Sequence, residues 1–564
     1  MDKKKLWIMV GGAMLALCLI ATCLVGVGGY TYWDRLAAIL GLAQPQKTAS
    51  MLPATTQFYA SFTPNLQNVS GYQNLKTLYL DKPEVKAALD KLKGEFEAET
   101  NLSFETDIQP WLGTEIVMAM PNFNEAIEDP SGATTPGFVV AVETTNLEAS
   151  NQFIEKVLAK AVEEDLPFTN QTYQEVTLHI QDNTNGEDVY LATFNNFVTA
   201  SNDETLIKSM IDQAQGRSES PTLAESERYK KVMQQLPANA IMTAYFDFGG
   251  LMESALQQAA VELPADQNQD FKAFEGVGVA GTLQADGVQL DSVISYDVTK
   301  MSETMKAALE QPASPNAVHQ LIPAEALLVY NANNLSRIWQ QTKQSLESTP
   351  DFAETLQDFE TEMGLSLDDD VFGWMTGEFA LVLIEATPVD EFDVPFGGYI
   401  LIGTDNVEQA QTKVTKVMDV MEAQGALPPL ETINVNGLDV QGTTNFTTGK
   451  FDTGYGFHEN YFFAAYREDS VTALTSAASN SLATSPNFMA VQERLPSSNY
   501  GYFYIDLDRF QTLMESQLSE FDREEYEQNV RPFLDPVRAV GASAEVAAAD
   551  SGMTKGRFFF LIKE

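Results

Sequence analysis

Cysteine and histidine are scarce in this chain of 564 residues, which contains two cysteines and three histidines. Both cysteines, Cys18 and Cys23, lie within one apolar N-terminal run, so the rest of the chain cannot form a disulfide bond. No spacing typical of metal ligands or of a Ser-His-Asp triad relates the histidines, which are His179, His319 and His458. We therefore expect no zinc, haem or iron–sulfur site and a fold that its apolar core alone holds together.

Positive charge is also in short supply, because 34 Lys and Arg residues stand against 79 Asp and Glu residues, for a formal net charge of −45. A nucleic-acid-binding protein needs surplus cations that replace counterions along the phosphate backbone, so we expect no nucleic-acid partner. Such an acidic surface resists aggregation, attracts divalent cations and is repelled by anionic lipid headgroups. The chain is nevertheless 44% hydrophobic, which is enough to bury a core.

Residues 6–29 contain no charged side chain and read LWIMVGGAMLALCLIATCLVGVGG. As a helix this run is roughly 36 Å long, enough to cross a hydrocarbon core of about 30 Å. It is longer than the apolar region of a cleaved signal peptide, and neither cysteine follows the small residue that a lipoprotein signal requires. Because three lysines precede it, we expect a cytoplasmic N-terminus and an extracytoplasmic body. The sequence thus predicts a cytoplasmic tip and transmembrane anchor in the lipid bilayer at 1–33 and a juxtamembrane linker at 34–50.

The chain also repeats itself. The segment NLSFETDIQPWLGTEIVMAMP contains Trp111 and Glu115, and the segment GLSLDDDVFGWMTGEFALVLIEATP contains Trp374 and Glu378 at matching places. Further matches follow along the chain at a nearly constant spacing, which is typical of a duplication. We therefore predict a first α+β repeat at 51–300, a linker at 301–320 and a second α+β repeat at 321–564.

The pattern within each repeat predicts largely antiparallel sheets with helices packed on them. Segments of alternating hydrophobicity flank Asn-Gly and Asp-Gly pairs, which are typical of β-hairpin turns, at 185–186, 286–287 and 436–437. Amphipathic helices are expected at 147–164 and 407–424. Together these elements indicate an α+β fold, and the long strand–helix alternation of a doubly wound parallel sheet is not found.

The residue spacing of a dinucleotide-binding motif occurs in the sequence, but the structural context of that motif does not. Gly276, Gly278 and Gly281 have the GxGxxG spacing, but they lie in an alternating strand that leads into a hairpin and not into a helix. The matching place in the second repeat keeps one glycine, Gly541. We interpret these glycines as positions of close packing on a strand.

The repeat-matched residues are the candidate ligand-binding residues. Trp111 with Glu115, and Trp374 with Glu378, could each stack on a ligand and accept its hydrogen bonds. The structural alternative, which we favour, is that each Trp packs into a sheet edge while each Glu caps a turn or faces solvent. Asp247 and Asp506, which each end a strand before a helix, are expected to be helix N-caps.

A calcium site is a further prediction. Oxygen ligands are what Ca²⁺ prefers, and three consecutive carboxylates occur at Asp368, Asp369 and Asp370. An extracytoplasmic compartment would supply the ion. No other cofactor is indicated.

The chain resembles an uncharacterised bacterial family of single-pass membrane proteins that contain a domain of unknown function. The N-terminal anchor, the stretch NLQNVSGYQNLKTLYLDKPEV at Asn65–Val85 and the WLGTE element carry this resemblance. It implies a bacterial envelope location and supplies no catalytic residues.

Three functions remain open on the sequence. The first is a non-enzymatic binding or scaffold module of the cell envelope, with an unknown protein or ligand as its partner. The second is a hydrolase of envelope glycans that uses two carboxyl groups, one of them with a raised pKa. The third is a carrier that holds an apolar ligand in a groove lined by Phe, Leu and Met.

Overall fold

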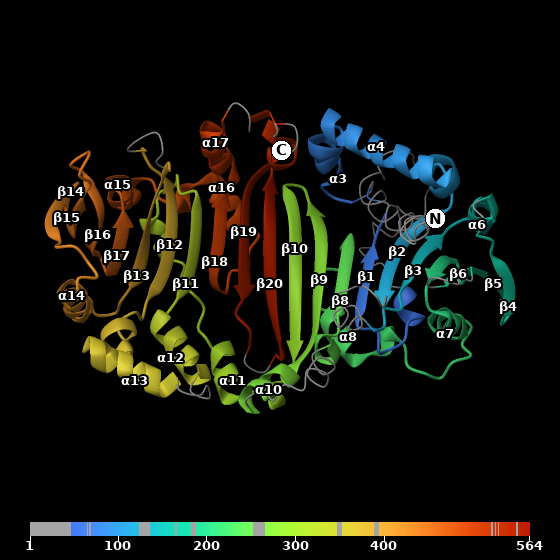
Figure 1. The fold of residues 1–564 in the computed structure, drawn as a ribbon, viewed down its shortest axis with the longest axis horizontal. Coiled ribbons are helices and arrows are strands. Elements are labelled where there is room, and N and C mark those ends of the chain that lie inside the picture. The colour runs from blue at the N-terminus through green and yellow to red at the C-terminus, as the bar shows by residue number, and fades with distance from the viewer. Residues whose placement is uncertain are drawn as a thin grey trace. The chain divides into compact units, whose positions relative to one another are not determined.

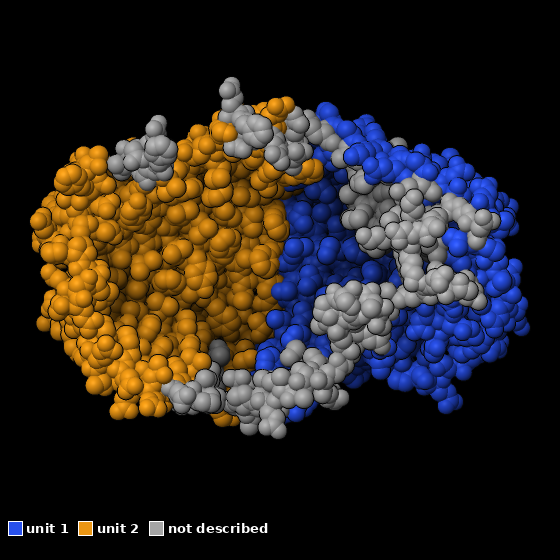
Figure 2. All heavy atoms as spheres, viewed as in Figure 1, with its two compact units in different colours: residues 1–300, 564 blue, residues 301–563 orange. Residues whose placement is uncertain are grey.

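The structure is a computed structural model, and it describes residues 47–563 except 65, 67–68, 123–135, 164–165, 182–187, 252–264, 347–351, 389–393, 520–522, 525, 528–529 and 549–550. It divides into two compact units, residues 1–300 with 564 (unit 1) and residues 301–563 (unit 2), which Figure 2 colours separately. The anchor predicted at 6–29 lies outside the described residues. Among the residues that are described, no helix has the length and apolar character needed to cross a membrane.

Unit 1 is built on antiparallel strands, which hydrogen bonds join in the order β4-β5-β6-β7-β3-β2-β1-β8-β9-β10 (Figure 1). The strands are β1 (Phe58–Phe62), β2 (Leu112–Met120), β3 (Val139–Thr144), β4 (Thr169–Tyr173), β5 (Val176–Gln181), β6 (Val189–Phe194), β7 (Phe197–Ser201), β8 (Met242–Phe246), β9 (Phe274–Gln284) and β10 (Gly287–Tyr296). The helices are α3 (Tyr72–Leu75), α4 (Pro83–Thr100), α6 (Leu147–Glu163), α7 (Glu204–Ala214), α8 (Glu227–Met233) and α10 (Ala265–Ala273). Shorter helical turns include η1 (Thr48–Ser50), η2 (Lys76–Leu80), η3 (Phe104–Ile108), η4 (Leu223–Glu225) and η5 (Val298–Lys300).

Local sequence signals set the ends of the unit 1 helices. Pro83 occupies the first turn of α4, where its missing N–H has no partner to lose. Asn101 ends that helix in the left-handed conformation, with φ of 57°. Asp203 caps α7 by accepting hydrogen bonds from the backbone N–H groups of Thr205 and Leu206.

Unit 2 has the same strand order, β14-β15-β16-β17-β13-β12-β11-β18-β19-β20, again all antiparallel. The strands are β11 (Leu328–Asn333), β12 (Glu378–Glu385), β13 (Phe396–Gly403), β14 (Glu431–Val435), β15 (Leu438–Thr444), β16 (Phe451–His458), β17 (Tyr461–Tyr466), β18 (Asn499–Asp506), β19 (Val537–Glu545) and β20 (Met553–Ile562). The helices are α11 (Glu303–Leu309), α12 (Leu335–Leu346), α13 (Phe352–Met363), α14 (Val407–Ala423), α15 (Glu468–Ser476), α16 (Pro486–Gln492), α17 (Leu507–Gln517) and α19 (Arg531–Leu534). Helical turns include η6 (Val318–Leu321), η7 (Leu367–Phe372), η8 (Ala477–Ser479) and η9 (Leu482–Thr484).

Several secondary-structure predictions are confirmed. The two amphipathic helices occur as α6 and α14, within one residue of the expected ends. Asn436 and Gly437 form the turn between β14 and β15, both with positive φ as this hairpin turn requires. The hairpin predicted at 286–287 also occurs, but its register differs, because Gly287 already belongs to β10. The pair at 185–186 lies outside the described residues.

Close packing explains the glycines of the GxGxxG match, which lie within strand β9 as the sequence indicates. A Cβ atom on Gly278 would stand 2.3 Å from Cγ1 of Val232 in α8. In unit 2, a Cβ atom on Gly541 of β19 would stand 2.1 Å from Cγ1 of Val491 in α16. In each unit a glycine therefore lets a helix lie directly against the sheet.

Candidate functional site

Both repeat-matched tryptophans lie in the apolar interior of their units. The Trp111 side chain is 1% exposed, packs on Phe153 of α6, and donates a hydrogen bond from Nε1 to the carbonyl oxygen of Asp107 at 2.7 Å. The Trp374 side chain is 5% exposed and packs edge-to-face on Phe462. This burial favours the structural alternative for the two indole rings over ligand stacking.

The matched glutamates cap helical turns, which is one of the two roles that the structural alternative gave them. Glu378 is buried and accepts hydrogen bonds at Oε2 from the backbone N–H groups of Ala317 (2.9 Å) and Val318 (3.0 Å) at the start of η6. Its Oε1 accepts from the Ser314 hydroxyl at 3.2 Å and from the Asn331 side-chain amide at 3.4 Å. A buried carboxylate is stable here because these donors surround it.

Glu115 holds the matching turn in unit 1. It accepts hydrogen bonds from the backbone N–H of Lys47 (3.1 Å), just before η1, and from the Tyr59 hydroxyl (3.0 Å). Burial raises the pKa of Glu115 to about 7, and the nearby Glu143 carboxylate adds to the rise. Although burial acts in the opposite direction, hydrogen bonds from Lys47 and Thr114 hold the pKa of Glu143 below its usual value.

Glu115 also lines a pocket of about 340 Å³ in unit 1, together with Tyr229 and Met233 of the α8 region. A carboxyl group of raised pKa in a pocket is what the hydrolase alternative requires of its acid. Among the described residues that line this pocket, however, Glu115 is the only Asp or Glu. The geometry therefore gives that acid no second carboxylate across the pocket.

The raised pKa of Glu115 makes unit 1 sensitive to pH. The folded state binds this proton more tightly than the unfolded state, so the contribution of Glu115 to stability is fully present below about pH 4.5 and is lost as the pH rises to about 7. We expect the protection of the β2 amides, measured relative to the exchange rate of an unstructured peptide at the same pH, to fall over that range by an amount that corresponds to at most about 3 kcal/mol. Glu115→Gln should remove this dependence, whereas an unchanged pH profile in the variant would contradict the assignment.

The three consecutive aspartates do not form one cation site. Asp370 is buried and pairs with Lys413 and Lys416 of α14; although burial opposes it, these partners hold the pKa of Asp370 well below its usual range. Asp368 pairs with Lys343 of α12, and Asp369 is exposed. Among the described residues, no three His, Cys, Asp or Glu side chains are grouped to hold a metal ion. Lysine ammonium groups thus supply the positive charge that a Ca²⁺ ion would bring.

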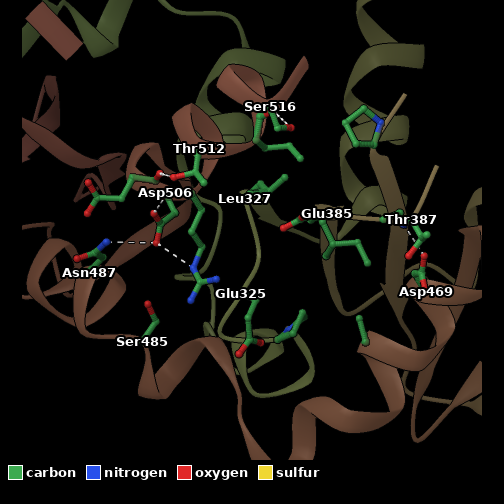
Figure 3. Close-up of a pocket in the computed structure, with 18 of the residues that line it drawn as sticks. Glu325, Leu327, Glu385, Thr387, Asp469, Ser485, Asn487, Asp506, Thr512 and Ser516 are labelled. Carbon is green, nitrogen blue, oxygen red and sulfur yellow. Dashed lines mark hydrogen bonds and ion pairs between the residues drawn. The ribbon is translucent and has the colours of Figure 1, made fainter. Parts of the chain in front are cut away.

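An open cleft of about 1030 Å³ lies in unit 2 (Figure 3). We call it the unit 2 cleft. It lies among the turn before β11, the end of β12, and the helices α15, α16 and α17. Its lining residues are Pro323, Glu325, Leu327, Ile384, Glu385, Ala386, Thr387, Pro388, Pro395, Asp469, Thr472, Ala473, Ser476, Ser485, Pro486, Asn487, Asp506, Asp508, Arg509, Thr512, Leu513, Ser516, Gln517 and Arg538.

Asp506 organises one side of the cleft. As predicted for strand-end aspartates, it is the N-cap of α17, and its Oδ1 accepts from the backbone N–H of Arg509 at 3.1 Å. Its Oδ2 accepts from the Asn487 side-chain amide at 3.2 Å and from the Tyr504 hydroxyl at 3.3 Å, and Figure 3 shows Asn487 reaching Asp506. Asp247 has the same role in unit 1, where it accepts from the backbone N–H of Gly250 at 3.1 Å.

The other carboxylates of the cleft are less constrained. One oxygen of Asp469 accepts from the backbone N–H of Thr387 at 2.8 Å, and one oxygen of Glu325 accepts from the Asn480 side chain at 2.6 Å. Glu385 is exposed at the end of β12. No described lysine or arginine forms an ion pair with any of these three carboxylates, although Arg509 and Arg538 also line the cleft.

A second surface of unit 2 is apolar. Antiparallel pairing places one residue from each of seven strands in a row across the sheet: Phe558, Ala542, Phe503, Tyr330, Leu381, Ile400 and Ala464. The exposed fractions are 49% for Phe558, 46% for Tyr330 and 44% for Leu381. The alternate residues of the same strands, such as Val329 and Phe559, are fully buried. The exposed members of this row (the apolar row) lie on the face of the sheet opposite the core, whereas Ile400 and Ala464 at one end of the row pack against the apolar cluster of Trp374 and α14.

Sequence reasoning missed the cleft except for the capping role of Asp506. Three of its carboxylates, Glu325, Glu385 and Asp469, are separated by many residues and belong to no motif. The only local signal is that Glu325 directly follows the Pro-Ala pair that precedes a strand. The apolar row could not be predicted from the sequence either, because it depends on the register of strands that lie far apart in the chain.

Fold and cavity together define an antiparallel α+β protein with a polar, carboxylate-lined cleft in its second unit. A family model described as "Protein of unknown function (DUF3352)" matches residues 14–562, so the chain belongs to this family. None of the curated proteins matches the chain.

Three solved structures, titled as crystal forms IV, I and III of TP0453, are similar to parts of the chain at 13%, 11% and 11% sequence identity. These matches cover 46%, 44% and 46% of this chain and 83%, 77% and 84% of the solved chains. Their TM-scores are 0.23, 0.22 and 0.23, and similarity at this level places no constraint on function.

Proposed function

We propose that this protein is a single-pass membrane protein of the bacterial cell envelope whose extracytoplasmic body binds a partner and catalyses no reaction. Residues 6–29 anchor it in the lipid bilayer, with the N-terminus in the cytoplasm. The charge-free run, the lysines before it and the absence of cysteine from the rest of the chain support this placement. The binding site is the unit 2 cleft.

The proposal includes a tandem duplication of the body. Its support is that the strand order of unit 1 recurs in unit 2 and that equivalent contacts recur with it. An isolated bridge joins Pro53 to Thr222 in unit 1, and one joins Pro323 to Ser481 in unit 2. The glutamate-capped turns η1 and η6 form a further pair. After a duplication each copy can diverge in sequence. We propose that the carboxylates of the cleft arose by such divergence in the second copy.

The residue composition of the cleft is the observation that favours binding over catalysis. Its described lining contains no His, Cys, Lys or Tyr, so no serine in it has the basic neighbour that a nucleophile needs. Asp506 is fully used as a helix cap, and Asp508 lies 3.5 Å from Arg538 and 3.6 Å from Lys563. What remains is a wide opening with carboxylates, hydroxyl groups and the Arg509 guanidinium, which suits recognition of a polar partner.

Site-specific cross-linking in the membrane tests this proposal. A photo-reactive amino acid replaces Thr512, which is exposed on α17 in the cleft, in the full-length chain. We expect a reproducible envelope component to be captured from this position and not from Thr361, an exposed position on α13. Equal capture from both positions, or none from either, would contradict a binding role for the cleft.

Carriage of an apolar ligand is the second candidate function, and the apolar row is the observation that favours it. Aromatic and aliphatic side chains exposed together on one face mark a binding surface more often than chance exposure does. A third photo-reactive position at Leu381 separates the two functions, because a carrier would yield lipid adducts there. Adducts at Leu381 without any at Thr512 would favour the carrier.

A further inference from the structure

The pocket of about 340 Å³ in unit 1 (the unit 1 pocket) lies among β1, β2, α8 and β8. Glu115, which is 5% exposed, contributes a buried carboxyl group to its lining. Met233, Leu236, Pro237 and Met242 make another part of the lining apolar. A pocket of this size and mixed lining suits a short peptide segment that has an apolar ring and a hydrogen-bonding side chain.

Strand register identifies the residues of unit 2 that match this pocket. The first strand of each unit pairs with the same two neighbours, and the matching pairs are Phe58 with Met120 and Phe246 in unit 1, and Leu328 with Leu383 and Ile505 in unit 2. Counting along the chain from these pairs gives three lining residues and their matches: Ser61 with Asn331, Glu115 with Glu378, and Ala240 with Asn499.

In unit 2 the three matching residues hold a segment of the chain itself. The Ser314 hydroxyl donates to Oε1 of Glu378 at 3.2 Å and lies 3.4 Å from Oδ1 of Asn331. The backbone N–H of Ser314 donates to the carbonyl oxygen of Asn499 at 2.8 Å, and Asn316 donates from Nδ2 to Oδ1 of Asn499 at 3.2 Å. Ser314 is 6% exposed, so the segment just before η6 is buried in the place that matches the unit 1 pocket.

The described part of unit 1 begins at the same place. Lys47 is its first described residue, and the Lys47 N–H bonds Oε2 of Glu115 as the Ala317 N–H bonds the matching glutamate of unit 2. Residues 43–46 precede Lys47 directly and read AQPQ, whereas residues 313–316 precede Ala317 and read ASPN. The two segments share the alanine and the proline and end in a side-chain amide.

The one large difference between the segments is matched by the lining. Gln44 stands where unit 2 has Ser314, so the unit 1 segment has the longer side chain at this position. Ser61 and Ala240, which line the unit 1 pocket, stand where unit 2 has two asparagines. The lining is therefore smaller where the segment is larger, as close packing requires.

We infer that residues 43–46 of this chain occupy the unit 1 pocket. The Gln44 side-chain amide donates to Glu115, the Gln44 backbone N–H donates to the carbonyl oxygen of Ala240, and the Pro45 ring packs on the apolar part of the lining. This inference rests on the tandem duplication that we propose above, and it gives the second repeat as the pattern for the first.

Docking of this segment has a consequence for the membrane placement. The proposed anchor ends at residue 29, so residues 30–42 alone would join it to the docked segment. Such a tether is at most about 45 Å long when fully extended. The pocket thereby keeps unit 1 near the membrane surface.

Disulfide trapping in the purified full-length chain tests the inference, with Cys18 and Cys23 replaced by serine. The pair Q44C/S61C is treated with a mild oxidant, and S314C/N331C, whose side chains are in contact, gives the reference rate. We expect the two disulfide bonds to form within each chain at rates within about tenfold of each other, because a docked segment has a high effective concentration. Thermal unfolding of the reduced variants checks that they are folded.

The matched control is Q44C/T172C. Thr172 is exposed in β4, at the opposite end of the strand order from β8 and its neighbours. Its disulfide bond should form at least about tenfold more slowly than that of Q44C/S61C. Equal rates for the two pairs would overturn the inference. A disulfide bond of Q44C/S61C between two chains would also overturn it, because the segment of a second copy would then occupy the pocket.

Hydrogen exchange gives a second measurement that needs no cysteine. Replacement of residues 43–46 by Gly-Ser-Gly-Ser should speed exchange of the amides of residues 229–243 by about tenfold, because it removes the hydrogen bonds of the docked segment. The same replacement at residues 34–37 should leave that exchange unchanged. Unchanged exchange in both variants would contradict docking of residues 43–46.

Failure of this inference is distinguishable from failure of the proposed function. Both measurements use the purified chain and need neither a membrane nor a partner of the unit 2 cleft. Capture of an envelope component from Thr512 without trapping of Q44C/S61C would overturn the docked segment alone. Trapping without any capture from Thr512 would support the docked segment and contradict the binding role of the cleft.

Discussion

Alanine at Gly278 should destabilise unit 1 by about 2–3 kcal/mol, the upper part of the range of about 1–3 kcal/mol for overpacked cores. The new Cβ would meet Cγ1 of Val232 at 2.3 Å and Cδ1 of Leu236 at 3.1 Å. Valine is branched at Cβ and cannot turn its methyl groups away, so α8 must move off the sheet. Calorimetry of the full-length protein should show the unfolding transition of unit 1 at lower temperature.

Two variants serve as controls for this effect. Gly94 is exposed in α4 with nothing near its Cβ position, so Gly94→Ala should stabilise the same unit by about 0.5–1 kcal/mol. Val232→Ala in the Gly278→Ala background should recover part of the loss, because it removes the clashing methyl groups. A Gly278→Ala protein as stable as the original would show that α8 does not pack directly on β9.

The second large effect is expected from Glu378→Ala, which should destabilise unit 2 by about 3–4 kcal/mol. The variant leaves the N–H groups of Ala317 and Val318 without their acceptor at the start of η6. Glu378→Gln should lose less stability, because the amide oxygen of the glutamine can still accept a hydrogen bond. Chemical denaturation, with hydrogen exchange of the β12 amides as the readout, measures the loss of stability in both variants.

The control for this prediction is Glu362→Ala on the exposed face of α13, which should change stability by no more than about 0.5 kcal/mol. If Glu378→Ala were equally harmless, the carboxylate would have no structural role. The alternative role of Glu378 as a ligand-binding residue would then gain support.

Local signals predicted the elements of the fold better than they predicted the site. The helices α6 and α14, the hairpin at Asn436 and Gly437, and the helix cap at Asp506 follow from residues close together in the chain. Each of these features depends on side-chain periodicity, turn conformation or capping, which are properties of a few consecutive residues.

Features that depend on tertiary contacts could not be predicted. The lysine partners of Asp370 come from α14, which lies more than forty residues away in the chain, so the aspartates alone suggested a calcium site. The burial of Glu115, and with it the raised pKa, depends on Tyr59 and on the turn at Lys47. The carboxylates of the cleft meet only because three separate elements end at one place.

Cysteine labelling of living cells is the most direct test of the membrane placement on which the proposed function rests. With Cys18 and Cys23 replaced by serine, the full-length chain has no thiol, and one cysteine is then introduced at the exposed Glu385 of the cleft. A membrane-impermeant maleimide should label this cysteine on intact bacterial cells, whereas a cysteine placed at Asp2 should be labelled only after lysis. Labelling at Glu385 only after lysis would contradict an extracytoplasmic binding module.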